Sequence, residues 1–217
     1  MRFFLDTVDA DEARRAKEWG LLDGAVVRAD AALAAGRDYR KAVSEISQVC
    51  DGPVFAAVAA GEPKGMYKEA RELAKLGKAI VVRLPMTREG LRVVRLLNDE
   101  QIAADVHLLA TPLQALLAAR AGAAYASVAV SGLDGAGQVG MDVVDAVVRI
   151  YDNYGLQTQI VVDAVQNPVH ALDAAAMGAD AAAIPFPVLD RLFDHPLTAQ
   201  GVAAIRTHAG EGPRRVH

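Results

Sequence analysis

Eight short aliphatic runs alternate with helix-like segments along the whole chain. The runs predicted as strands are Arg2–Asp6, Gly24–Arg28, Pro53–Val58, Ala79–Leu84, Ile102–Leu109, Tyr125–Val130, Thr158–Ala164 and Ala181–Ile184. Strands that alternate with helices form βαβ units, whose strands lie parallel in one sheet. Eight such units within 217 residues predict a (β/α)8 TIM barrel, at the small end of the size range for that fold.

An open, doubly wound sheet would show the same alternation. That fold normally carries a glycine-rich phosphate loop directly after its first strand. Here the first predicted strand runs into Asp6-Thr7-Val8-Asp9, which contains no glycine. The barrel is therefore the favoured interpretation.

Helix ends recur at the same place in successive units. Thr87 and Asn167 are placed to cap the helices that begin at Arg88 and Pro168. The glycines expected to end helices in a left-handed conformation are Gly20, Gly77, Gly122, Gly155 and Gly178. This regular punctuation predicts one barrel domain over residues 1–208, followed by a flexible tail at 209–217.

Composition excludes several classes of function. The net charge of −4 argues against a nucleic-acid partner, and Cys50 as the one cysteine excludes an internal disulfide. The apolar start, Met1–Leu5, is too short for a signal peptide or a membrane span. We therefore expect a cytoplasmic protein with neither membrane nor nucleic-acid partners.

Several segments carry a family resemblance that covers nearly the whole chain. They are Arg2–Thr7, Gly20–Gly24, Asp51–Val54, Ile80–Leu91, Gln114–Ala123, Ile150–Gly155, Ala175–Asp180 and His195–Thr198. In their motifs, order and spacing the chain resembles the small transaldolase/fructose-6-phosphate aldolase family. The resemblance implies a class I aldolase barrel. It also implies a homo-oligomer, a pentamer or decamer, assembled partly through a C-terminal helix.

The resemblance also implies a lysine at the position where this chain has Arg83. In the family that lysine attacks the ketose carbonyl and forms a Schiff base. A guanidinium cannot do so, because it stays protonated and its nitrogen lone pairs are delocalised. The six lysines of the chain fall in predicted helices or loops: Lys17, Lys41, Lys64, Lys68, Lys75 and Lys78. Only Lys64, after the third strand, is expected near the barrel mouth.

Other positions that the resemblance marks as functional also differ, and Asp6 alone is unchanged. The family's threonine, asparagine and serine on the second strand correspond to Val26, Arg28 and Asp30. The remaining replaced positions are Ala57, Asp105, His107, Gly132, Ala164 and Gln166. So many coordinated differences predict a rebuilt site rather than one inactivating change.

The rebuilt site gathers charged residues at the carboxyl ends of the strands, where barrel enzymes place their chemistry. We predict Asp6, His107 and Asp105 as catalytic residues, and Arg28, Arg83 and Asp30 as substrate-binding residues. Arginine forks suit carboxylate or phosphate, and a histidine of ordinary pKa moves protons near neutral pH. The leading hypothesis is a lyase- or isomerase-type enzyme that needs no cofactor and acts on a small anionic, sugar-derived substrate.

Four alternatives stay open from the sequence. The arginine–aspartate pairs could form an inactive polar plug in a metabolite-binding or structural homologue, or transaldolase activity could persist as the resemblance implies. Asp6, His107, Asp105 and Asp163 resemble a metal-ligand set, but nearby arginines oppose a cation, and Asp163 is expected beside an inward position rather than at one. No metal is predicted. The glycine-rich segment Ser131–Gly137 is either an anion cradle or, preferably, a mobile lid.

Overall fold

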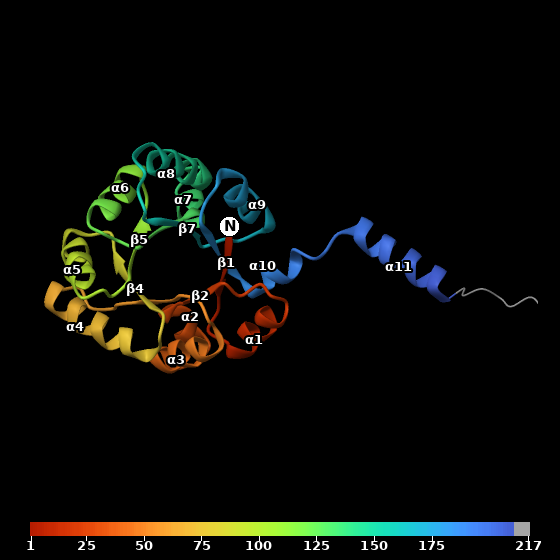
Figure 1. Cartoon of the computed structure of the whole chain (residues 1–217), viewed down its shortest axis with the longest axis horizontal. Coiled ribbons are helices and arrows are strands. Elements are labelled where there is room, and N and C mark those ends of the chain that lie inside the picture. The colour runs from red at the N-terminus through yellow and green to blue at the C-terminus, as the bar shows by residue number, and fades with distance from the viewer. Residues whose placement is uncertain (211–217) are drawn as a thin grey trace, which may run out of the picture.

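The computed structural model of the chain describes residues 1–210. Its eight strands are all parallel and hydrogen-bonded in sequence order, and β8 closes the barrel on β1 (Figure 1). The strands are β1 Arg2–Asp6, β2 Gly24–Val27, β3 Val54–Ala57, β4 Ile80–Pro85, β5 Ala104–Leu109, β6 Tyr125–Ala129, β7 Gln159–Asp163 and β8 Ala181–Pro185. The predicted (β/α)8 barrel is confirmed, with strand ends within two residues of the expected ones.

Helices surround the strands as a ring, and one helix stands away from it (Figure 1). The ring is formed by α1 Ala10–Glu18, α2 Ala29–Ala34, α3 Tyr39–Val49, α4 Pro63–Leu73, η1 Ala74–Leu76, α5 Arg88–Asp99, α6 Pro112–Arg120, α7 Val130–Gly135, α8 Gly140–Tyr154, α9 Pro168–Met177 and α10 Phe186–Arg191. The outlying helix is α11, Pro196–Gly210. The predicted tail at 209–217 therefore begins inside α11, and its residues 211–217 lie outside the described part.

The prediction that the glycine-rich segment after β6 is a loop is wrong. Most of that segment is the short helix α7, whose Val130 and Leu133 are buried three residues apart on one face. The side chain of Asp134 accepts a hydrogen bond of 2.8 Å from the N–H of Gly140, at the start of α8. Its glycines hid this helical spacing in the sequence.

The predicted helix punctuation is correct with one exception. Thr87 accepts from the Gly90 N–H, Asn167 accepts from two N–H groups at the start of α9, and four of the five stop glycines have positive φ. Gly77 instead has an extended backbone, with φ −167°. A Cβ there would lie 2.6 Å from the side chain of Ser47, so close helix contact explains this glycine.

The barrel interior is apolar at the amino ends of the strands. Rings of Phe4, Phe55 and Tyr125 meet there, with centroids 5.2 Å apart for Phe4–Phe55 and 4.9 Å apart for Phe55–Tyr125. The buried interior cluster is completed by Val26, Val81, Val161, Ala181 and Ala183. This cluster is called here the apolar plug. Side chains two residues further along a strand point the same way. Each strand therefore presents its next inward residue to the space between the apolar plug and the carboxyl ends of the strands.

We predict that Gly90→Ala destabilises the barrel at β4. An added Cβ would lie 2.1 Å from the carbonyl oxygen of Pro85, which is backbone and cannot move cheaply. Overpacking of this kind costs about 1–3 kcal/mol in the free energy of unfolding, which urea denaturation would measure. Gly135→Ala in α7 is the matched control, because a Cβ added there would have no neighbour within 4 Å. Equal stability of both variants would contradict the prediction.

Candidate functional site

Arg83 occupies the centre of the polar half of the barrel. It follows Val81 of the apolar plug by two residues on β4 and therefore points inward. Its Nε lies 2.8 Å from Asp105 Oδ2 on β5, and its Nη2 lies 2.5 Å from Asp163 Oδ2 on β7. The exposed fractions of the three side chains are 4%, 0% and 11%. A guanidinium thus joins two carboxylates across the barrel, away from water.

Each carboxylate has a further donor. The hydroxyl of Ser127 on β6 lies 2.8 and 2.9 Å from the two oxygens of Asp105. The other oxygen of Asp163 accepts a 2.8 Å bond from the N–H of Ala164. Ala164 has φ +57°, a left-handed backbone that is uncommon for a residue with a Cβ. β7 therefore ends directly after Asp163.

The cluster of Arg83, Asp105 and Asp163, called here the arginine triad, carries unequal proton affinities. Burial raises the pKa of Asp105, and the charge of Arg83 and the bond from Ser127 only partly oppose it. For Asp163, burial is outweighed by the charge and hydrogen bond of Arg83, so its pKa is lowered. Burial alone would lower the pKa of Arg83, but the two carboxylates raise it. The guanidinium is therefore permanently charged and held.

A second, looser group lies nearer the solvent. Arg28 Nη1 lies 3.5 Å from Asp6 Oδ2, and Arg28 Nη2 lies 3.3 Å from Asp30 Oδ2. Arg28 is 39% exposed and Asp30 74% exposed, whereas Asp6 is 10% exposed. The Nε of Arg28 is buried without a partner within residues 1–210. The guanidinium that remains available to a ligand is thus Arg28 rather than Arg83.

The environment of Asp6 gives it a proton affinity suited to work near neutral pH. Burial raises its pKa to about 6, against the attraction of Arg28 and with a further upward contribution from Asp163. The pKa of His107, two residues after Asp105 on β5, is shifted in the opposite direction. Burial and the charge of Arg83 lower its pKa to about 3, so its imidazole is neutral at pH 7. The expectation that His107 titrates near neutral pH is therefore corrected.

The structure places five of the six predicted site residues in these two groups, with two changes, and His107 lies two residues beyond Asp105 on β5. Asp163 occupies an inward position, two residues after Val161, so the expectation that it only neighbours one is wrong. Ser127, inward after Tyr125, was also missed. Inward side chains alternate with outward ones along each strand, so counting two residues on from Val161 and from Tyr125 would have identified Asp163 and Ser127 as inward. Arg83, predicted to bind substrate, has Nε and Nη2 engaged by protein carboxylates.

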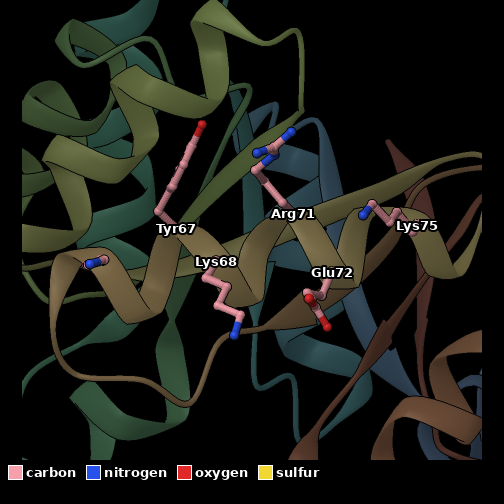
Figure 2. Close-up of a pocket in the computed structure, with 6 residues that line it drawn as sticks. Tyr67, Lys68, Arg71, Glu72 and Lys75 are labelled. Atoms are coloured by element: carbon pink, nitrogen blue, oxygen red, sulfur yellow. The ribbon is translucent and has the colours of Figure 1, made fainter.

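No lysine enters this site. All six lysines are exposed, on helices or in the turn before β4. Lys64, expected near the mouth, lines a shallow hollow on the outer face of α4 together with Tyr67, Lys68, Arg71, Glu72 and Lys75. Figure 2 shows that Tyr67 and Arg71 point to one side of α4 and Lys68 and Glu72 to the other, with Lys75 following in η1. The hollow is a solvated helix face, in which Arg71 pairs with Glu100 and Glu72 with Arg40.

Residues 1–210 contain neither a metal-binding group of side chains nor a membrane-spanning helix. No group of three or more His, Cys, Asp or Glu side chains there is arranged to hold a metal ion. Among the same residues, no helix has the length and apolar character needed to cross a bilayer.

The closed parallel barrel with charged inward residues at its carboxyl end defines a (β/α)8 TIM-barrel protein. Residues 3–211 match the family model described as Transaldolase/Fructose-6-phosphate aldolase. The chain therefore belongs to the transaldolase/fructose-6-phosphate aldolase family, as the resemblance predicted.

Relatives of nearly equal length agree with this assignment. A "Probable transaldolase" of Methanococcus maripaludis is 45% identical over 203 residues, covering 94% of each chain. One from Geobacter sulfurreducens is 47% identical, covering 93% of this chain and 94% of the relative. Another, from Coprothermobacter proteolyticus, is 44% identical, with 93% of each chain covered. All three relatives thus carry the name of a probable transaldolase.

We predict that Arg83→Met strongly destabilises the fold. It leaves Asp105 and Asp163 as unpaired buried carboxylates, which costs about 3–5 kcal/mol of unfolding free energy in urea denaturation. The triple variant Arg83→Met/Asp105→Leu/Asp163→Leu should recover most of that loss, because no charge stays buried. As the control, Arg149→Met breaks only an exposed pair with Asp145 and should cost less than about 1 kcal/mol. A loss for Arg83→Met no larger than the control would refute the structural role of the triad.

The raised pKa of Asp6 predicts a particular pH dependence of stability. The folded state binds the Asp6 proton more tightly than the unfolded chain, so this contribution is complete below about pH 4 and is lost as pH rises through 6. The free energy of unfolding of Asp6→Asn, relative to that of the wild type, should therefore increase by roughly 3 kcal/mol as pH rises from about 4 to 7.5. Urea midpoints measured across that range, with Asp152→Asn on α8 as the control, would show the difference. A pH-independent difference would contradict the assigned pKa.

Proposed function

We propose that this chain is a transaldolase-fold enzyme that works without a lysine Schiff base, and that it moves protons on a small anionic, sugar-derived substrate. The observation that carries the proposal is the burial of Arg83 between Asp105 and Asp163. A guanidinium so held is neither a nucleophile nor free to leave its partners.

The absence of an imine follows from chemistry rather than from geometry alone. Imine formation needs a neutral amine whose lone pair adds to the carbonyl carbon. Arg83 keeps its proton at any working pH, and its carboxylate partners raise its pKa further. The exposed lysines, including Lys64 on α4, face solvent outside the barrel.

Proton transfer is the chemistry that the remaining groups support. Asp6, with a pKa of about 6, would remove a proton from a carbon next to a carbonyl group, and the electron pair would move onto the carbonyl oxygen. The neutral imidazole of His107 suits donation of a hydrogen bond to that oxygen. Where the deprotonated carbon carries a hydroxyl, transfer of that hydroxyl proton to the new oxyanion and return of the proton from Asp6 to the former carbonyl carbon complete an isomerisation. Expulsion of a leaving group from the carbon on the other side of the deprotonated carbon gives a lyase reaction instead.

Binding falls to Arg28, with Asp30 beside it. Arg28 lies at the mouth, is partly exposed and is held only by contacts of 3.3 and 3.5 Å, so it can turn to an anionic group. Asp30, exposed next to it, suits substrate hydroxyls. Asp105 and Arg83 form the fixed floor of the site, below these groups. No cofactor enters this scheme, and we place the protein in the cytoplasm.

Two other functions have observations in their favour. The closed arginine triad favours a non-catalytic, metabolite-binding homologue, in which the polar half of the barrel is a structural plug. The names of the relatives favour transaldolase or aldolase activity. All three functions give different results in one paired experiment.

The experiment combines covalent trapping with solvent exchange. Borohydride is added with dihydroxyacetone or fructose 6-phosphate, followed by intact mass, and we expect no adduct, whereas a transaldolase that has the lysine gives one. In parallel, a panel of sugar acids and sugar phosphates is incubated in deuterium oxide. We expect enzyme-dependent deuterium incorporation, at least about 100-fold reduced in Asp6→Asn.

The outcomes separate the candidates. A stable reduced adduct on a lysine would restore the Schiff-base activity and refute the proposal. Ligand binding that is lost in Arg28→Met but accompanied by no exchange would favour the non-catalytic homologue.

A homo-oligomer, a pentamer or decamer, is part of the same proposal. Helix α11 stands away from the barrel and exposes Leu197, Val202 and Ile205 (Figure 1). We predict that light scattering gives the mass of five or ten chains. A chain ending at residue 195 should be a monomer with the same circular dichroism per barrel residue. A monomeric full-length chain would contradict this.

A further inference from the structure

The pairing of β5 with β6 is irregular at the carboxyl end of the barrel. Val106 and Leu109 of β5 pair with two residues of β6 that only Ser127 separates. His107 and Leu108 together therefore oppose this one residue. Val106 and Leu109 both belong to the core that the strands share with the helices, whereas Ser127 points into the barrel. The extra residue is thus added to the inner side of β5, and bulges of this kind often lie beside active sites, where they re-aim a side chain.

Leu108 is an unusual residue for this position. Its φ is +62°, a left-handed backbone that asparagine or glycine adopts more readily than leucine. Its side chain is 61% exposed, so it gains little from burial in the folded chain. The other non-glycine residues with positive φ among residues 1–210 are Gln101 and Ala164, whose side chains are polar or small. Leu108 thus combines backbone strain with an exposed apolar side chain, which points to a contact outside the folded chain.

The place of Leu108 on β5 relates it to the site. The inward residues of this strand run from Asp105 in the arginine triad to His107, and Leu108 follows directly on the side of the solvent. The N–H of Met86, which follows β4, donates a 3.1 Å hydrogen bond to the carbonyl oxygen of His107. The bulge is therefore held from β4 as well as from β6. Because the neighbouring groups of the site are polar, Leu108 adds an apolar surface at the barrel mouth.

We propose that Leu108 is a specificity-determining residue, whose side chain packs against a methylene group of the substrate beside the carbonyl group to which His107 donates. This contact selects an anion in which the carbon next to the carbonyl carries no hydroxyl, because a hydroxyl pressed against leucine would lose its hydrogen bonds to water. The substrate class is thereby narrowed to deoxy sugar derivatives whose anionic group Arg28 binds. Such a substrate can undergo only the lyase reaction proposed above, because the isomerisation needs a hydroxyl on that carbon.

The inference rests on the proposed function only in placing the substrate between Arg28 and His107, and its test measures binding rather than turnover. The probes are 2-oxogluconate and 3-deoxy-2-oxogluconate, which differ by the one hydroxyl on the carbon next to the carbonyl. Isothermal titration of the full-length chain should give a dissociation constant about 10-fold lower for the deoxy acid. A wild-type chain that binds neither acid, or binds both equally, would overturn the inference.

Leu108→Asn is the decisive variant, because asparagine has nearly the shape of leucine and suits the left-handed backbone, but lacks the apolar surface. We expect the ratio of the two dissociation constants to fall to about 1, with an unchanged or higher urea midpoint. Leu108→Met should keep the preference. Leu117→Asn, at an exposed leucine of α6, is the control and should leave the ratio as it is in the wild type.

A Leu108→Asn chain that keeps the wild-type ratio would overturn the inference. An equal loss of affinity for both acids together with a lower urea midpoint would mark Leu108 as structural and would overturn it as well. The result is separable from that of the proposed function. A preference that depends on Leu108 without any hydrogen exchange would leave this inference standing and count against the proposed proton transfer, whereas exchange without a preference would do the reverse.

Discussion

The ion cluster of Arg83 with Asp105 and Asp163 is the constraint on which the rest of the site depends. A guanidinium in the dry centre of a barrel is stable only if carboxylates neutralise it at hydrogen-bond distance, because desolvating either charge alone costs several kcal/mol. Contacts of 2.8 and 2.5 Å provide this, and Ser127 and the Ala164 N–H satisfy the remaining oxygens. Three strands are thereby tied across the barrel at one height.

This constraint divides the barrel into layers with different tasks. Aromatic and aliphatic side chains around Phe4 and Phe55 fill the amino end. The arginine triad forms a charged floor above them. Asp6, Arg28 and His107 then stand between that floor and solvent. Burial raises the pKa of Asp6 against the attraction of Arg28, and the negative charge of Asp163 in this floor adds to the rise. The proposed chemistry therefore relies on a group tuned by burial and by a like charge.

Much of the fold could be predicted from the sequence because its signals are local. Strand runs, the Thr87 and Asn167 caps and four stop glycines each act within a few residues. Helix α7 was missed because its glycines masked a short apolar spacing. The misplacement of Asp163 arose at the end of β7, where Ala164 leaves the regular strand and the inward alternation stops one residue earlier than expected.

The site was less predictable, since its properties depend on distances between strands far apart in sequence. The sequence indicates that Arg83 and Asp105 share the polar half, but which carboxylates Arg83 would contact depends on side-chain packing across the barrel. The neutral state of His107 likewise follows from burial beside Arg83, which a strand pattern does not specify.

The most direct test of the account is nitrogen-15 NMR of the Arg83 side chain in the full-length protein. If the guanidinium is locked between two carboxylates, its Nε–H should exchange with water far more slowly than those of exposed arginines such as Arg149, and should stay protected when a sugar ligand is added. Rapid exchange, or release of Arg83 from Asp105 and Asp163 on ligand binding, would contradict the account, because Arg83 would then be a mobile ligand-binding residue.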